Sequence, residues 1–480
     1  MIFNSIDFAI FLPIVLTIYW IIDRNNFKLQ NLFIAFTSYF FYGWWNWTFL
    51  TLIFASTIVD YLIGRNLVKS VVKRKRKLLL GLSISFNIGI LLYFKYFNFF
   101  LENFTTAFSF FGYKLESESL NVILPVGISF YTFQTLSYTI DVYRKKIDPT
   151  HNFIAFIAFV SFFPQLVAGP IERASHLLPQ FLKKRKLDYS LFVSGANQIL
   201  WGLFKKIVIA DRLAIVVNEI YNSPNEYHGF TLILATILFA FQIYCDFSGY
   251  SEIAIGTAKL FGFDLMQNFN LPYFSASLSE FWRNWHISLS TWFRDYLYIP
   301  LGGNKTSKVR WYMNILIVFI ISGFWHGANW TFIIWGAIHG VALIIEANFS
   351  LIKTPKVPFV YMLKRTTTFV IVCLGWVFFR SNSLENAMYI LNNIMDFSGY
   401  HLSQLNLYIV PTEKNTVFAI DIFLSILLIL ALAFIEYFFL QKSNFQMLRF
   451  RYKLLLYTVC IWSILVLGSF EKNEFIYFQF

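Results

Sequence analysis

The sequence predicts an all-α, multi-pass membrane protein, and three observations support this fold class. Hydrophobic residues make up 57% of the 480 residues and charged residues only 14%, whereas soluble domains carry about 25% charged residues. Apolar stretches close to the roughly 20 residues that a transmembrane helix needs recur along the chain. Basic residues lie mostly in the short loops between these stretches, which is typical of loops kept on the cytoplasmic side of a membrane.

The apolar stretches run from one end of the chain to the other. They lie at about 6–22, 31–46, 48–64, 78–100, 122–141, 153–168, 191–210, 230–247, 311–345, 364–380, 416–440 and 452–470. No internal repeat, low-complexity tract or soluble domain separates them, so residues 1–480 are expected to form a single membrane domain. The start, Met1–Phe11, lacks the basic region of a cleavable signal, so the first helix is expected to stay in the mature protein.

The basic run Lys73–Lys77 sets the predicted orientation. Placing this run in the cytoplasm puts the N-terminus outside after three spans. The loop with Glu102, Glu116 and Glu118 then falls outside, and the basic segment Tyr143–Lys146 returns to the cytoplasm. The charge pattern is self-consistent as far as this segment.

A second basic run, Lys183–Lys186, also belongs in the cytoplasm, although only the stretch 153–168 separates it from Arg144. That stretch contains Pro164 and is followed by a further Gly-Pro pair. We therefore predict a re-entrant segment over about 153–170. Non-helical backbone at membrane depth needs cover from protein or a water-filled cavity, which implies a bundle with a central cavity.

The chain changes character between Asp246 and Lys308, where aromatic, charged and small residues are interleaved without an apolar span of 18 residues. Trp282, Trp285 and Trp292 fall in this region. Tryptophan is enriched at membrane interfaces. The pattern predicts helices over about 250–308 that lie in the interface or line a funnel.

Charge and cysteine content exclude several other classes. The formal net charge of +13 is explained by positive-inside loops, and no nucleic-acid partner is expected. Cys245, Cys373 and Cys460 form neither a disulfide framework nor a metal-ligand spacing. The sequence also lacks a phosphate loop, a dinucleotide-binding fingerprint and zinc-type spacing, so no metal and no bound cofactor is predicted.

His326 is the strongest candidate for a catalytic residue. It lies within the apolar stretch 311–345, where an ionisable group is costly and is by default a functional hypothesis. Imidazole titrates near neutral pH and can take a proton from a hydroxyl. The alternative is a histidine that only hydrogen-bonds a neighbouring helix.

Glycines spaced four apart surround this histidine. The pairs Gly323/Gly327 and Gly336/Gly340 predict small faces for close helix packing. His339 lies in the second of these faces and has weaker surroundings, so we expect it to be structural.

His286 is the second candidate. On a helix, Trp282 and Ser290 would flank it at one turn on either side, and Arg283 would lie three residues before it. A nearby cation would help to keep the imidazole neutral and able to accept a proton. The alternative is an interfacial histidine that anchors an amphipathic helix.

Three further positions are considered for chemistry. Asp246 directly follows an apolar stretch and either lines the cavity or is an ordinary interfacial carboxylate. Arg294 and Asp295 are adjacent, so they should point to different helix faces, and Asp295 is expected to orient another side chain rather than pair with its neighbour. Ser248 lacks the context of a nucleophile elbow.

Six stretches together resemble one protein family, the membrane-bound O-acyltransferases. The resemblance is to its bacterial branch of alginate O-acetylation and teichoic-acid D-alanyl transfer proteins, and it extends to the tail Phe475–Phe480. The stretches that carry it are Leu124–Gln134, Phe163–Ile171, Asp246–Tyr250, Phe281–Ser290, Trp292–Gly303 and Phe324–Gly327.

The resemblance implies a ring of roughly 11–12 transmembrane or re-entrant helices around a central funnel. It implies that His326 is catalytic and that His286 is its companion across the cavity. Asn284 stands where relatives often carry a basic residue and Glu252 where they often carry Asp, which bears on substrate preference. Residues expected to contact substrate or line the funnel are Asp246, Trp282, Arg283, Asn284, Trp285, Arg294, Asp295 and Trp325.

The implied function is acyl transfer, most simply of an acetyl group, in the bacterial cytoplasmic membrane. A thioester co-substrate, either acetyl-CoA or an acylated carrier protein, approaches from the cytoplasm. His326 acts as general base on a hydroxyl of an extracytoplasmic polysaccharide. His286, Asn284 or an indole N–H stabilises the oxyanion, and membrane lipids surround the helices.

Two rival functions stay open at this stage. A transporter or lipid flippase would use the histidines as proton relays, but secondary transporters usually show paired repeats and none is visible. Alternatively the chain passes the acyl group across the membrane to a separate extracytoplasmic acetyltransferase partner.

Overall fold

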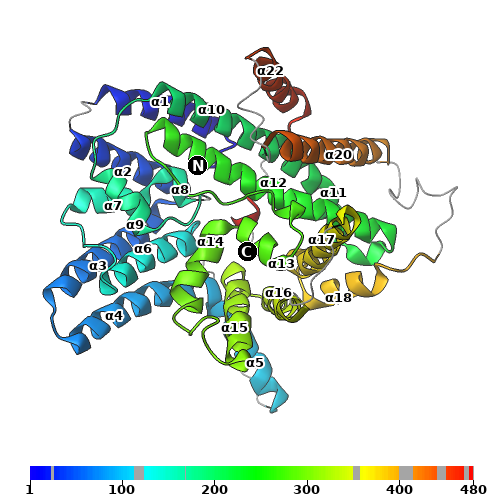
Figure 1. Cartoon of the computed structure of the whole chain (residues 1–480), viewed down its shortest axis with the longest axis horizontal. Helices are drawn as coiled ribbons and strands as arrows, with labels where there is room; N and C mark the ends of the chain where they lie inside the picture. The colour runs from blue at the N-terminus through cyan, green and yellow to red at the C-terminus, as the bar shows by residue number, and fades with distance from the viewer. Residues whose placement is uncertain are drawn as a thin grey trace. The chain divides into compact units, whose positions relative to one another are not determined.

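A computed structural model of the chain describes residues 1–22, 26–112, 124–167, 169–349, 357–398, 415–440, 450–469 and 475–478. Within these ranges the regular structure is helical and includes no β-strand (Figure 1). Among the predicted features, Glu116, Glu118, Ala168 and the last two residues of the tail lie outside the described residues.

The all-α membrane prediction is confirmed. Six helices in the described part of the chain are long and apolar enough to cross a membrane: Trp47–Lys69, Lys73–Phe110, Phe230–Leu260, Lys308–His326, Trp330–Phe349 and Pro358–Arg380. Shorter apolar helices are Ile6–Ile21, Phe153–Leu166, Ile422–Phe438 and Lys453–Leu467. The helices group into two compact units. The ring of helices, the funnel and the single domain stay predictions.

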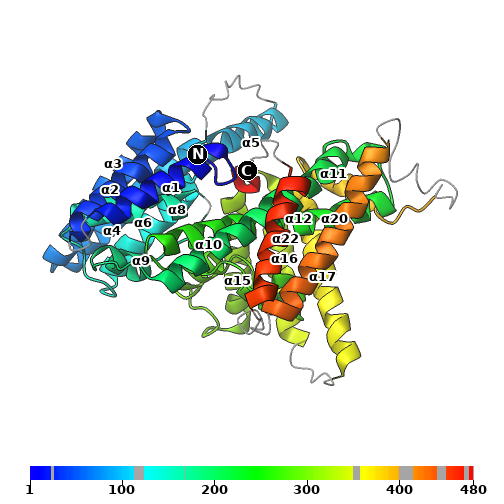
Figure 2. The ribbon, with the colours of Figure 1, turned by 90° about the horizontal axis from the view of Figure 1, so that it is seen from above.

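Unit 1 comprises Met1–Ile199 and Ser251–Gln267. Its first four helices, drawn in blue, lie side by side (Figure 2). Side-chain oxygens of Ser5, Asn26 and Asn152 accept backbone N–H groups in the first turns of three of its helices, as expected for N-cap residues. Its helices are α1 (Ile6–Ile21), α2 (Phe27–Gly43), α3 (Leu50–Lys69), α4 (Lys73–Leu91), α5 (Phe97–Phe110), α6 (Ile128–Tyr143), α7 (Phe153–Ser161), α8 (Phe163–Leu166), α9 (Ala174–Phe181) and most of α10 (Tyr189–Leu203).

The segment predicted to be re-entrant consists of two short helices, α7 and α8, which a sharp break at Phe162 separates. Gln134 of α6 donates a hydrogen bond of 2.7 Å to the Phe159 carbonyl and accepts one of 3.1 Å from Gln165. The Phe163 N–H donates to the Ser38 hydroxyl of α2 at 3.1 Å. The break is therefore buried and hydrogen-bonded by the neighbouring helices, as backbone away from water must be.

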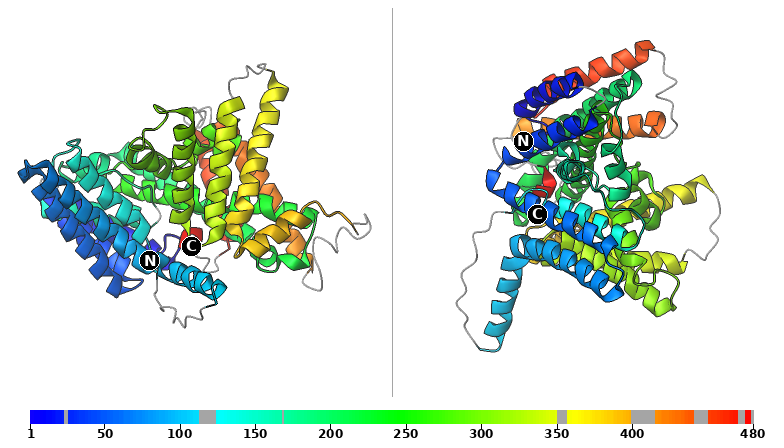
Figure 3. Two further views of the ribbon diagram at one scale, coloured as in Figure 1. Left: turned by 90° about the horizontal axis from the view of Figure 1, so that it is seen from below. Right: turned by 90° about the vertical axis from the view of Figure 1, so that its left-hand side faces the viewer.

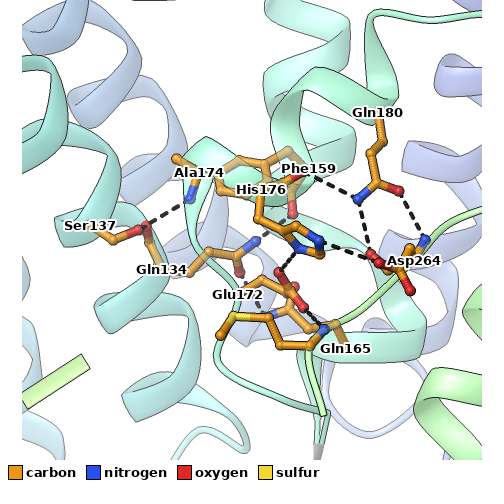
Figure 4. Close-up of polar contacts among 10 residues, drawn as sticks. Gln134, Ser137, Phe159, Gln165, Glu172, Ala174, His176, Gln180 and Asp264 are labelled. Atoms are coloured by element: carbon orange, nitrogen blue, oxygen red, sulfur yellow. Dashed lines mark hydrogen bonds and ion pairs between the residues drawn. The ribbon is translucent and has the colours of Figure 1, made fainter. Parts of the chain in front are cut away.

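A polar cluster joins α9 to the segment after α12 (Figure 4). The His176 ring lies 2.8 Å from buried Glu172 and 3.4 Å from exposed Asp264. Gln180 exchanges two hydrogen bonds, each 2.9 Å long, with the backbone of Asp264. The hydrogen bond to Glu172 raises the pKa of His176 above its usual value. This cluster fixes the chain where it leaves α12.

Unit 2 comprises Leu200–Tyr250 and Asn268–Phe480. The long helix α12 (Phe230–Leu260) therefore contributes residues to both units. A π-helical turn, Phe204–Ala210, precedes the first complete helix of unit 2. Its other helices are α11 (Asp211–Asn222), α13 (Leu278–Asn284), α14 (Ile287–Phe293), α15 (Lys308–His326), α16 (Trp330–Phe349), α17 (Pro358–Arg380), α18 (Leu384–Asn393), α20 (Asn415–Ile435) and α22 (Phe450–Leu467).

Two predicted stretches have different bounds in the structure. The stretch 311–345 is two helices, α15 and α16, because the chain becomes extended at Gly327 and the Asn329 side chain accepts the Thr331 N–H at 3.0 Å. The stretch 230–247 continues as helix to Leu260, so Asp246 lies inside α12 rather than after a span.

Close packing of α15 against α16 confirms the predicted contact at Gly323 and Gly336, but Gly327 lies beyond the end of α15 and is not part of a helix face. A side chain on Gly323 would meet the backbone carbonyl of Phe332, and one on Gly336 would meet that of Phe319. The two helices therefore approach at backbone distance, as glycines at a helix interface allow. They lie next to α17, and the three appear side by side in green to yellow (Figure 3, left).

Candidate functional site

His326 is the last residue of α15, and its side chain is buried, with 4% of the residue exposed. It therefore lies at a helix end and not in mid-span as predicted from the stretch 311–345. Aromatic rings surround it, with centroids 4.9 Å away for Trp325, 5.1 Å for Trp335, 5.3 Å for Phe379 and 5.5 Å for Tyr477. The C-terminal end of a helix favours a positively charged imidazole.

His286 lies between α13 and α14 in a left-handed backbone conformation, with φ 42° and ψ 55°. The prediction of one helix through this residue is wrong, and Trp282 and Ser290 do not flank it at helical spacing. The segment that contains Asn268 packs against this region, and the Asn268 carbonyl accepts the Ile287 N–H at 2.9 Å. That N–H is therefore not bonded within a helix that runs through His286.

The His286 imidazole is buried, with 1% of the residue exposed. Its Nδ1 lies 3.2 Å from Asn268 Oδ1, and its Nε2 has no hydrogen-bond partner among the described residues. Burial lowers the pKa of His286 to about 3, so the ring is neutral at physiological pH. The predicted cause, the cation Arg283, is an exposed side chain, and burial alone accounts for the shift.

The structure brings the two candidate histidines together within unit 2. Trp325 contacts both rings, at 6.2 Å from His286 and 4.9 Å from His326. Tyr477 also contacts both, at 6.4 Å and 5.5 Å. The red C-terminal segment that carries Tyr477 is drawn beside α13 and α14 (Figure 1). Both imidazoles therefore belong to one buried aromatic cluster.

Asp246 is buried within unit 2 and ion-paired. It lies 2.8 Å from the buried Lys206 ammonium, which also lies 2.7 Å from Asp211. Its other oxygen accepts the backbone N–H of Ile476 at 2.7 Å. Asp246 thus attaches the C-terminal segment to α12 and helps to place Tyr477 against the histidines.

The predicted tryptophans lie in the same aromatic cluster. Trp285 is buried with its ring 5.1 Å from Trp376. Trp282 lies 5.6 Å from Trp335 and 5.0 Å from His339, which is fully buried. These four tryptophans connect the surroundings of His339 to those of the catalytic candidates.

Asn284, Arg294 and Asp295 make polar contacts outside the aromatic cluster. Asn284 donates a hydrogen bond of 3.3 Å to Ser275. Arg294 and Asp295 form an ion pair of 2.8 Å, so the prediction that they do not pair is wrong. They lie in a π-helical turn, Arg294–Tyr298, and the exposed, flexible arginine side chain reaches its half-buried neighbour.

A cavity of about 540 Å³ lies within unit 2 and is lined by residues close in sequence to the two histidines, although neither histidine lines it. Ile287, next to His286, lines it, and so does Ser322, one helical turn before His326. Arg283 and Arg294 line it as exposed side chains. Most of the remaining lining is apolar: Trp282, Leu289, Phe293, Trp311, Ile315, Val318, Phe319 and Leu343. The cavity has the size of a small-molecule site.

Sequence reasoning missed the roles of Asn268, Lys206 and Tyr477. Asn268 stands in a polar loop with no periodicity, and Tyr477 was noted only as part of the tail. The signal that could have found Lys206 is its position beside Lys205 in an otherwise apolar stretch, because buried lysines need carboxylate partners. Among the described residues no group of three His, Cys, Asp or Glu side chains could hold a metal ion.

Comparisons with known proteins place the chain among relatives of known family. The profile of the MBOAT, membrane-bound O-acyltransferase family, matches residues 29–385. The chain is 41% identical over 410 residues to "Probable alginate O-acetylase AlgI" of Pseudomonas aeruginosa, covering 85% of this chain and 77% of that protein. It is 36% identical over 426 residues to "Peptidoglycan O-acetyltransferase" of Helicobacter pylori, covering 82% and 80%. "Teichoic acid D-alanyltransferase" of Bacillus subtilis is 31% identical over 279 residues, covering 54% and 69%.

Proposed function

The chain belongs to the membrane-bound O-acyltransferase family, and we propose that it moves an acetyl group from a cytoplasmic thioester to a hydroxyl of an extracytoplasmic polysaccharide. The observation that supports this most is the pair of buried imidazoles, His286 and His326, that share the rings of Trp325 and Tyr477 beside a cavity. The experiment that tests it measures ester-linked acetate in extracellular polysaccharide with and without the gene. Unchanged acetate in the deletion strain would contradict the proposal.

In the proposed reaction His326 is the general base. It accepts the proton of the acceptor hydroxyl as that oxygen attacks the thioester carbonyl. The C–O ester bond forms, the C–S bond breaks, and the proton passes from His326 to the departing thiolate. Because His326 ends α15, the helix dipole stabilises the imidazolium between these steps. General-base help of this kind is worth about 10²–10⁴-fold.

The oxyanion of the tetrahedral intermediate needs a hydrogen-bond donor. The Asn284 amide already donates to Ser275. The indole N–H of Trp335 is buried, lacks a partner among the described residues, and belongs to a ring in contact with His326. We assign the donor role to Trp335. The imidazole of His286 is neutral, and we assign it the role of passing on the transferred proton.

The cavity beside the histidines fits the arm of a thioester donor, acetyl-CoA or an acylated carrier protein. Apolar walls suit the alkyl part of such an arm, and the exposed Arg283 and Arg294 suit its phosphate groups. A water-poor cavity also limits hydrolysis of the thioester.

Narrowing the cavity should weaken donor binding. Val318 lines it from α15, so we expect Val318→Trp to raise the KM for acetyl-CoA by about tenfold or more with a smaller effect on kcat. Ile320 lies two residues along the same helix, is exposed and does not line the cavity, so Ile320→Trp is the matched control. Equal KM values in the two variants, measured by acetyl transfer in vesicles, would remove the cavity from the donor path.

We also propose that the basic loops share the cytoplasmic side and that 153–170 is re-entrant. Several contacts in unit 1 support this. Arg76 donates to the Tyr143 carbonyl at the end of α6, and Arg185 donates to the Phe27 carbonyl at the start of α2. Between Tyr143 and Arg185 the chain reaches Ser38 of α2 through the Phe163 N–H, about 10 Å along that helix from Asn31. It then returns to the level of Asn31, whose amide donates to the Phe181 carbonyl.

Single cysteines placed at Lys75 and Lys184 test this topology. Both should react with an impermeant maleimide only when the cytoplasmic face is open, because each lies in a basic run predicted to be inside. Glu102→Cys is the control and should be labelled from the outside. Labelling of Lys75→Cys and Lys184→Cys from opposite faces would mean that 153–170 spans the membrane.

The acceptor is proposed from chemistry shared by the relatives, whose names mention alginate and peptidoglycan O-acetylation. A second route, transfer to an extracytoplasmic acetyltransferase partner that finishes the reaction, uses the same centre with a different final hydroxyl. Membership of an acyltransferase family leaves the transporter hypothesis without support.

A further inference from the structure

Asn268 makes an unusually complete set of contacts with the segment that carries His286. Its side chain is buried, and its Oδ1 lies 3.2 Å from the imidazole Nδ1. The same oxygen accepts the Ser288 N–H at 3.3 Å and the Ser288 hydroxyl at 2.7 Å. Its backbone carbonyl accepts the Ile287 N–H at 2.9 Å. One residue thus holds both the imidazole and the backbone on which it stands.

These contacts define the protonation of the ring. A backbone N–H can only donate, so the Asn268 atom facing the Ser288 N–H must be the amide oxygen and not the nitrogen. An amide oxygen can only accept, so the imidazole Nδ1 opposite it must carry the proton. In a neutral imidazole the other nitrogen then has the free lone pair. That nitrogen, Nε2, is the one without a partner among the described residues.

We infer that Asn268 is a positioning residue that holds His286 in the Nδ1–H tautomer and presents the basic Nε2 to the reaction centre. The inference rests on the proposed function, because it assumes that His286 takes part in acyl transfer. It also explains the left-handed backbone of His286, which non-glycine residues rarely adopt and which Asn268 stabilises through the two N–H groups that follow it. The arrangement follows the logic of a base oriented by a third group.

A double-mutant cycle separates positioning from plain structural support. Asn268→Ala should lower kcat by about tenfold or more and leave the KM for acetyl-CoA nearly unchanged. In a His286→Gln background the same substitution should cost less than about twofold, because the group through which it acts is gone. Asn270→Ala is the matched control, since Asn270 is the same residue type in the same loop with an exposed side chain. Equal losses in both backgrounds would overturn the inference.

Asn268→Asp provides a second test in a variant of the same shape. The carboxylate still accepts the Nδ1 proton, but its charge favours the imidazolium and raises the pKa of His286. This pKa, followed in the nitrogen NMR signals of the imidazole, should rise by about one unit or more. Among the described residues, the ionisable side chain of Tyr477 contacts this ring. His326 lies on the other side of Trp325, which contacts both imidazoles. Asp246 on α12 is paired with Lys206.

The two tests have separate outcomes. A pKa of His286 that is unchanged in Asn268→Asp would contradict the contact between the two side chains, and nitrogen NMR signals of a wild-type ring protonated on Nε2 would contradict the tautomer assignment. Failure of His286→Gln to lower the rate at all would instead overturn the proposed role of His286, and with it the premise. Size-exclusion elution and the melting temperature of each purified variant establish that it is folded.

Discussion

Replacing His326 with alanine should leave a folded, membrane-inserted protein that no longer transfers acyl groups. The imidazole is the base at the centre of the aromatic cluster, and its loss should lower the rate by at least about 10²–10⁴-fold. The fold should survive because the helices on either side are held together at Gly323 and Gly336, away from the imidazole. Acetyl transfer by purified protein in vesicles, with size-exclusion elution as the folding check, measures both.

His339 supplies the matched control for this prediction. It is another buried histidine, lies on α16, and contacts Trp335, the ring that also contacts His326. We expect His339→Ala to lower thermal stability and to keep most of the activity. Comparable activity loss in the two alanine variants would show that the assay reports damage to the cluster and not loss of a base.

Replacing His286 with glutamine should lower the rate by about 10²-fold or more. Glutamine keeps polarity and hydrogen-bonding capacity but cannot take up a proton. If His286 only anchors an interfacial segment, the same change should lower expression slightly and leave turnover intact. The buried position against Phe247 and Trp325 favours the first outcome.

Turnover of purified His286→Gln protein decides between these outcomes. A value close to wild type would assign His286 a structural role only. The activity loss should be independent of the donor concentration, because the imidazole is proposed to act on the transferred proton and not on donor affinity.

The fold class could be predicted from sequence because composition and apolar length are properties of the whole chain. Helix ends were less predictable. The break between α15 and α16 depends on Asn329 capping the next helix, and the stretch 311–345 shows no interruption in hydrophobicity there. In the same way α12 continues past Asp246 because Lys206 neutralises that carboxylate inside the protein. Such compensation comes from another helix and leaves no local signal.

The two histidines of the site were predictable, since ionisable residues among aromatic and apolar neighbours are rare. Their environment was not. Helical spacing placed Trp282 and Ser290 around His286, but the segment that contains Asn268 breaks the helix there. Tyr477 reaches the site across more than 150 residues of chain from His326, through the Asp246 contact at Ile476. Contacts of that range follow from tertiary packing, which periodicity does not contain.

The central claim is that acyl transfer to polysaccharide depends on the imidazole of His326. The most direct measurement is the content of ester-linked acetate in extracellular polysaccharide from deletion cells that carry either wild-type protein or only His326→Ala, at matched levels in the membrane. The account predicts that wild-type protein restores the acetate and that the variant leaves it at the level of the deletion strain. Normal ester content in cells that carry only His326→Ala would contradict it.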